Sequence, residues 1–124
     1  MYRQLIIMGA ISAFLSVILG AFAAHGLKQS FGDYEKAIWQ TAVEYQMYHS
    51  LALVLMGLAA NSLKINLNKP GYTMLCGIIL FSGSLYLLSL TGIKTLGMIT
   101  PLGGLCFLVA WLWFALSIYK HEKP

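Results

Sequence analysis

Four side chains in the first half of the chain are of types that transfer protons or bind metals: His25, Glu44, Tyr45 and His49. Histidine titrates near neutral pH and ligates metals, as carboxylates also do. Tyr45 and His49 are four residues apart, so on a helix they lie on one face within reach of each other. The set fits a proton relay, a metal site or a pair of cofactor ligands. It fits equally a hydrogen-bonded cluster that ties two helices together. No dense ligand motif such as HExxH occurs, so we expect neither a metal nor a cofactor.

These residues belong to the stretch Asp33–Leu58, which begins like a water-soluble amphipathic helix and ends like a membrane span. A helical wheel separates three faces. The apolar face, expected toward lipid, consists of Val43, Met47, Leu51, Val54 and Leu58. The second face carries most of the candidate buried polar site, and His25 from the preceding helix completes it. The members of this site are His25, Thr41, Glu44, Tyr45, Tyr48 and His49. A third face carries Trp39, Gln46, Ser50 and Gly57.

Glu44 is the acid expected deepest in the membrane. A charged side chain at the centre of a membrane helix costs about 2.5–3.5 kcal/mol on insertion scales, so Glu44 should be protonated or paired. We expect His25 as its partner, brought to the same depth by the end of the preceding helix. Tyr48, one turn along from Glu44, can donate its hydroxyl.

The composition of the chain is that of a membrane protein. Of its 124 residues, 59% are hydrophobic and only 10% are charged. A soluble domain of this length needs more charge to stay dispersed. The formal net charge is +4, but the basic residues are scattered singly. They form none of the basic runs that are typical of nucleic-acid-binding proteins.

Three apolar runs of about 20 residues, each long enough to cross about 30 Å of hydrocarbon, and the more polar second stretch together predict an all-α, integral membrane four-helix transmembrane bundle. We expect a single transmembrane domain over residues 1–124, with spans at about 5–24, 39–60, 72–90 and 101–119. The first run also resembles a secretory signal, because Ala21-Phe22-Ala23 fits a cleavage site. A stripe of small residues favours a permanent, closely packed helix instead. The expected helix-packing residues are Gly9, Ala13, Ser16, Gly20, Gly83, Gly103 and Gly104.

Smaller features complete the expected organisation. Asp33 is expected to cap the second helix, residues 61–69 to form a loop, and Gly92 to end the third span. Ser82, Ser84, Tyr86 and Ser89 put hydroxyls in the third span, which we expect to bond to helix carbonyls rather than line a polar path. Cys76 and Cys106 should lie about 15 Å apart in depth and stay unbridged.

The basic residues also indicate topology. With four spans, one side of the membrane holds Arg3, Lys64, Lys69, Lys120 and Lys123, and the other holds Lys28, Lys36 and Lys94. Because positive charge is retained on the inner side, both termini are expected in the cytoplasm of a bacterial inner (plasma) membrane, multi-pass.

Four motifs resemble one known family. They read GAFAAHGL (20–27), WQTAVEYQMYH (39–49), FSGSLYLLSLTG (81–92) and LGMITPLGG (96–104). Over nearly its whole length the chain resembles domain-of-unknown-function family four-two-three, an uncharacterised small membrane protein family whose vertebrate relatives are called transmembrane protein two-five-six. The first motif usually reads GAFGAHGL, and here Ala23 replaces the glycine. The resemblance implies a four-helix inner-membrane protein and brings no established activity.

Two functional classes stay open. The first is a small transporter or channel-like protein, oligomeric because four short spans enclose little volume. The second is a structural or accessory membrane subunit with a dry polar network between helices. An enzyme is the least supported class, since no nucleophile–base pair has a recognisable spacing. The expected partners are the lipid bilayer, a second copy or another membrane protein, and an unidentified small molecule or ion, with no nucleic acid.

Overall fold

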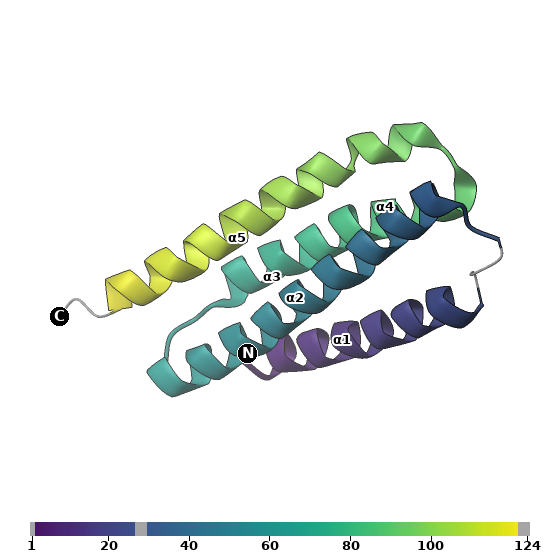
Figure 1. Cartoon of the computed structure of the whole chain (residues 1–124). Helices are drawn as coiled ribbons and strands as arrows, with labels where there is room; N and C mark the ends of the chain where they lie inside the picture. The colour runs from purple at the N-terminus through teal and green to yellow at the C-terminus, as the bar shows by residue number, and fades with distance from the viewer. Residues whose placement is uncertain (1, 27–29, 122–124) are drawn as a thin grey trace.

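The computed structural model describes residues 2–26 and 30–121, which form four long helical rods in alternating directions (Figure 1). The first rod is α1 (Tyr2–His25) and the second is α2 (Asp33–Leu63). The third runs through α3 (Asn68–Gly77), the π-helical turn η1 (Ile78–Ser82) and α4 (Gly83–Thr91). A 3₁₀ turn η2 (Lys94–Met98) leads into the fourth rod, α5 (Thr100–His121). The all-α prediction is confirmed. Two of the topology lysines, Lys28 and Lys123, lie outside the described residues.

The helix ends differ in part from expectation. Asp33 is the first residue of α2 and does not cap it; instead, the Glu35 carboxylate accepts the Gly32 N–H at 2.9 Å. Lys64 takes a left-handed conformation (φ 57°) and its N–H bonds back to the Ala60 carbonyl, so α2 runs further than expected and the loop after it is short. Gly92, with φ 72°, ends α4 as expected, because glycine adopts that conformation without strain.

Three helical stretches among the described residues are long and apolar enough to cross a membrane: Tyr2–His25, Asn68–Thr91 and Lys94–His121. The polar second rod, α2, is absent from this set because of its side chains, not its length. It packs antiparallel to α1 along its length and also against α3, η1 and α4, so the other rods shelter much of its polar surface. Together the rods form the expected four-helix membrane bundle, and the membrane boundaries within each rod stay a prediction.

The contact between α1 and α2 is close enough to set the register of the two helices. A Cβ added at Gly9 would lie 2.6 Å from the Ser50 carbonyl oxygen and 2.8 Å from Val54, and one at Gly20 would lie 3.3 Å from Val43. Val43 and Val54 therefore face α1, so the expectation that their stripe faces lipid was wrong for these two residues. Leu51 and Leu58 of the same stripe are exposed, and they share the exposed face of α2 with Gln40, Tyr48 and Leu55.

A second close contact joins the third rod to α5. A Cβ added at Gly103 would overlap the backbone of Phe81, 2.7 Å from its Cα, and one at Gly77 would lie 2.5 Å from the Phe107 ring. Two of the glycines that were expected at close helix contacts do not lie at one. A Cβ at Gly83 would meet nothing within 4 Å, and one at Gly104 would make only ordinary contact with Phe81. The sequence did not predict the π turn, since its residues are ordinary helix formers.

This register also corrects the position of the cysteines. Phe107 lies beside Gly77, and Gly103 beside Phe81, so Cys76 and Cys106 are about 3 Å apart in depth at 1.5 Å per residue. The expected 15 Å was wrong because the connection between the third and fourth rods is longer than a simple hairpin. Both thiols are free.

The glycine contacts give a paired prediction. Gly103→Ala should lower the free energy of unfolding in detergent by about 1–3 kcal/mol, because the added methyl meets backbone that cannot move aside. Gly83→Ala should raise it by up to about 1 kcal/mol, because the site is open and alanine favours the helix. Thermal unfolding followed by circular dichroism compares the two variants. Equal effects at the two positions would contradict the packing described.

Candidate functional site

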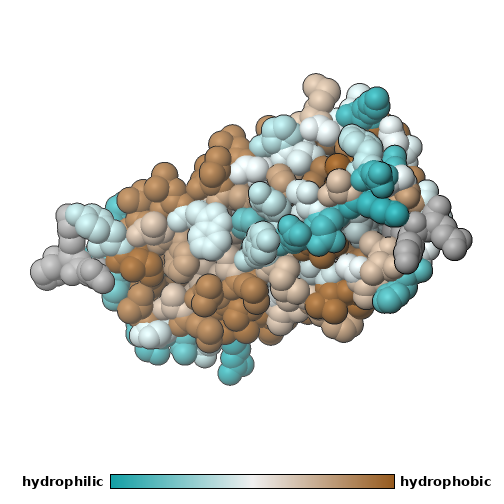
Figure 2. All heavy atoms as spheres, viewed as in Figure 1, coloured by the Kyte–Doolittle hydropathy of each residue, from teal (hydrophilic) through white to brown (hydrophobic). Residues whose placement is uncertain are grey.

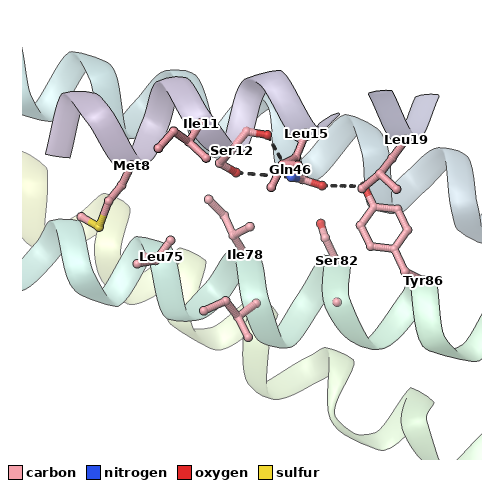
Figure 3. A pocket seen from close by; sticks show the side chains of 12 residues that line it. Met8, Ile11, Ser12, Leu15, Leu19, Gln46, Leu75, Ile78, Ser82 and Tyr86 are labelled. Atoms are coloured by element: carbon pink, nitrogen blue, oxygen red, sulfur yellow. Dashed lines mark hydrogen bonds between the residues drawn. The ribbon is translucent and has the colours of Figure 1, made fainter. Parts of the chain in front are cut away.

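Gln46 of α2 bonds to two other helices at once (Figure 3). Its Nε2 donates to the Ser12 carbonyl of α1 at 2.9 Å and lies 3.4 Å from the Ser12 hydroxyl. Its Oε1 accepts from the Tyr86 hydroxyl of α4 at 2.6 Å. Gln46 and Ser12 are both buried. One carboxamide therefore joins three rods of the bundle.

Ser50, one turn after Gln46, completes this network. Its Oγ lies 2.5 Å from the Gln46 carbonyl oxygen and 2.6 Å from the Ser12 Oγ. A hydroxyl has one proton to donate, and a carbonyl can only accept. Ser50 therefore donates to the Gln46 carbonyl, and the Ser12 hydroxyl donates to the Ser50 Oγ. Every proton in the network is thus used inside the bundle. We call Ser12, Gln46, Ser50 and Tyr86 the core network.

Single hydrogen bonds extend the attachment of α2 in both directions. Ser16 donates to the Val43 carbonyl at 2.9 Å, and the Trp39 indole donates to the Leu19 carbonyl at 2.9 Å. From η1, Ser82 donates to the carbonyl of Ala42 at 2.7 Å. Ser82, Ser84 and Ser89 of the third rod each donate to a helix carbonyl as expected, whereas the Tyr86 hydroxyl donates to the Gln46 side chain. No buried side-chain nitrogen or oxygen of the described residues lacks a partner.

The residues of the expected polar site do not gather in one place. Leu19 is level with Trp39, so His25, six residues further along α1, lies near the start of α2 and is exposed. Glu44 lies eleven residues into α2, about 16 Å from that level. Its carboxylate accepts from Gln40 Nε2 at 3.0 Å. The expected Glu44–His25 pair was wrong because α1 and α2 cross in a register that keeps the two residues at different depths.

His49 is the one buried member of the expected set, and it faces a different neighbour. Its Nδ1 lies 2.6 Å from the Tyr45 carbonyl, and its ring stacks on Phe107 of α5, with centroids 3.5 Å apart and planes 9° apart. Tyr45, Phe81 and Trp111 surround the pair. Thr41 bonds to the Ala37 carbonyl of its own helix. His49 thus belongs to an aromatic contact between α2, η1 and α5.

The sequence contained a signal for the core network. Gln46 and Ser50 share the third face of the helical wheel with Trp39 and Gly57, and this is the face that α1 covers. Small residues mark such a close contact, and an amide beside them indicates a hydrogen bond across it. The titratable groups Glu44, Tyr45, Tyr48 and His49 lie on other faces of the helix.

The neighbouring face remains uncovered. Gln40 and Tyr48 are exposed, with Tyr48 54% exposed, while Glu44 between them is half-buried. Tyr45, also on this side, is 38% exposed. We call Gln40, Glu44, Tyr45 and Tyr48 the polar stripe. Figure 2 shows hydrophilic side chains as a band over the first half of α2, bordered by apolar surface.

A groove lies on the opposite side of α2, between α1 and the third rod. Its volume is about 420 Å³, and α1 contributes apolar side chains to one wall and α3, η1 and α4 to the other (Figure 3). Its lining residues are Met8, Ile11, Ser12, Leu15, Leu19, Gln46, Leu75, Ile78, Ile79, Ser82, Gly83 and Tyr86. Ser12, Gln46 and Tyr86 of the core network therefore form its floor.

No group of three or more histidine, cysteine or acidic residues in the described part of the chain is placed to hold a metal ion. The arrangement that the described residues do contain is a rigid hydrogen-bonded bundle with a polar stripe on one side and an apolar groove on the other. This fold and these surfaces define the class of the protein: a small integral membrane protein built as an antiparallel four-helix bundle.

Comparison with known proteins identifies the family. The chain belongs to the family described as "Protein of unknown function (DUF423)", which matches residues 19–104, and the resemblance drawn from its motifs is confirmed. It is 46% identical over 118 residues to the UPF0382 membrane protein SAB0533 of Staphylococcus aureus (strain bovine RF122 / ET3-1), covering 95% of this chain and 97% of the relative. It is 46% identical over 121 residues to the UPF0382 membrane protein YwdK of Bacillus subtilis (strain 168), covering 96% and 98%. No solved structure matches the chain.

The core network predicts a contrast between two glutamines on one helix. Gln46→Leu removes the bonds to Ser12 and Tyr86 and should lower the free energy of unfolding by about 1–3 kcal/mol. Gln40→Leu changes the same residue type at an exposed position and should stay within about 0.5 kcal/mol of the parent. Thermal unfolding in detergent measures both. A loss at Gln40 as large as at Gln46 would mean that the network does not hold the bundle together.

Proposed function

We propose that the protein is an accessory subunit of the bacterial plasma membrane, which docks through its polar stripe on a transmembrane helix of another membrane protein. The observation that carries this proposal is the exposure of Gln40 and Tyr48 on either side of the half-buried Glu44, in the middle of an apolar bundle. Side chains of this kind in a membrane normally face a protein interior or another protein.

The depth of the stripe follows from the helix register. Val43 lies beside Ser16, and Gln46 beside Ser12, so Glu44 is level with the centre of α1. At that level α1 exposes Phe14 (64%) and Leu15 (45%), which are typical of lipid contact. A carboxyl at this depth has one hydrogen bond from Gln40. It would gain further bonds, and lose contact with lipid, if a second helix covered it.

The interior of the bundle supports an accessory role over solute transport. Transport of a polar solute needs polar atoms along its path, whereas the buried polar atoms of the described residues bond to each other. The rods α1 and α5 present mainly apolar side chains outward. The surfaces that remain for function are therefore the outer ones.

A partner other than a second copy fits the stripe better. A twofold dimer whose axis passes beside Glu44 would bring the two Glu44 carboxyls close together, because residues at the axis of a symmetric interface meet their own copies. Two ionised carboxyls would repel strongly in a medium of low dielectric constant. A helix that carries hydrogen-bond donors or a basic side chain would satisfy Glu44, Gln40 and Tyr48 without that repulsion.

The proposal includes an orientation with both termini in the cytoplasm. The start of α1 and the end of α5 lie at one end of the bundle, together with the short connection from α2 to α3 (Figure 1). We expect an alkaline phosphatase fused to the C-terminus to be inactive, and a fluorescent protein fused there to fold and fluoresce. An active phosphatase fusion at the C-terminus would reverse the orientation.

Photocrosslinking in intact cells tests the docking. Benzoylphenylalanine at Tyr48 should form a discrete protein adduct, while the same residue at Phe14, exposed at similar depth on α1, should form none. Glu44→Gln should preserve the adduct, because the amide still forms hydrogen bonds. Glu44→Leu should reduce it at least fivefold while leaving the thermal stability of the isolated bundle unchanged, since the residue is half-exposed and bonds only to Gln40.

The size of the adduct separates the alternatives. An adduct at twice the mass of the chain would mean self-association and would contradict the accessory role. Absence of any adduct at Tyr48 beyond that at Phe14 would contradict docking through the stripe altogether.

A further inference from the structure

We propose that the groove between α1 and the third rod binds a single-chain lipid that bears a hydroxyl group, with the hydroxyl at Tyr86 and the chain along the apolar walls. This site is separate from the polar stripe, because Glu44 and Gln46 point to opposite sides of α2. The proposal therefore does not depend on the proposed docking function.

The dimensions of the groove favour one hydrocarbon chain. From Met8 to Leu19 on α1 it extends roughly 16 Å at 1.5 Å per residue. Division of its 420 Å³ by this length gives a mean cross-section of about 26 Å². A helix with its side chains is about 10–12 Å wide, which needs about 80–110 Å². A methylene chain, whose carbons contact neighbours at about 4 Å, needs about 15–20 Å².

The groove also lies where a lipid chain can enter it. Ile11 and Ile79, one from each wall, are 55% and 61% exposed, so the opening faces the surroundings of the bundle, which in a membrane are lipid. Its floor contains Gln46, which is level with the middle of α1. The site is thus reached from within the bilayer.

The floor selects for a hydroxyl because its polar atoms can only accept. The Tyr86 proton goes to Gln46, the Gln46 amide protons point to Ser12, and the Ser82 proton goes to the Ala42 carbonyl. What remains toward the groove are oxygen lone pairs, chiefly that of the half-buried Tyr86 hydroxyl. An alcohol or phenol can donate to that oxygen. An ether, an ester or a ketone has no proton to donate.

Two residues make the site testable. Trp39 contacts Tyr86 with ring centroids 4.7 Å apart and bonds to Leu19 at the end of the groove, so it reports on occupancy. The chain contains three tryptophans, and Trp111→Phe with Trp113→Phe leaves Trp39 alone. Gly83 lines the groove and has no neighbour within 4 Å of an added Cβ, so a larger side chain there fills the groove without disturbing the network.

The experiment measures quenching of Trp39 fluorescence in the full chain, in nanodiscs of saturated phosphatidylcholine. The probes are a chain-dibrominated octadecanol and its methyl ether. We expect saturable quenching, with the alcohol binding about two- to tenfold more tightly than the ether, the ratio that one hydrogen bond produces. Tyr86→Phe should bring the ratio to about one.

Three further variants distinguish binding in the groove from binding elsewhere on the bundle. Gly83→Leu should weaken binding of both probes at least fivefold, and it does so even if Tyr86→Phe fails to fold. Gly104→Leu, on α5 outside the groove, and Glu44→Leu, on the polar stripe, should change neither affinity.

Several results would overturn the proposal. Quenching that rises linearly with probe concentration, equal affinities for the alcohol and the ether, or no effect of Gly83→Leu would each do so. Loss of quenching as the protein concentration increases would mean that a second copy fills the groove, which would also overturn it.

Discussion

Hydrogen bonds to α2 are the constraint on which the structure depends. Lipid offers no partners to polar groups, so those of a membrane helix must be satisfied inside the bundle. The Gln46 carboxamide forms its hydrogen bonds to Ser12 of α1 and Tyr86 of α4. Hydrogen bonds from Ser16, Trp39 and Ser82 attach α2 at other levels. Helix α2, which carries the polar side chains, becomes the centre of the bundle for this reason. The more apolar α1 and α5 can then lie outside.

Close backbone contact is what allows these short side chains to reach. Serine hydroxyls span only a small gap, and Gly9 lets the backbones of α1 and α2 approach to within that gap. Gly103 does the same for α5 against the third rod. Packing and hydrogen bonding therefore depend on each other in this protein, and neither can be changed alone without cost.

The sequence predicted the number, type and approximate extent of the helices, because long apolar runs and the Gly92 cap carry strong local signals. It did not predict which side of α2 faces inward. Glu44 and His49 are the groups associated with chemistry, yet Gln46 and Ser50 form the interior contact. A wheel sorts residues onto faces but does not say which face meets a neighbour, and that depends on contacts such as Gly9 against Ser50. The predicted depth of His25 was wrong for the same reason, because the packing of α1 against α2 sets their register.

The π turn at Ile78–Ser82 has a consequence for how this fold can vary. Such a turn accommodates one residue more than an α-helical turn. Deleting a single residue there would leave a regular helix of nearly the same length. It would also leave α4 facing nearly the same way, because one turn of π-helix and one turn of α-helix each complete a single rotation. Tyr86 would then still face Gln46. The fold therefore tolerates the loss of one residue at this turn, whereas a deletion in the α-helical part of the third rod would rotate the residues beyond it by about 100°.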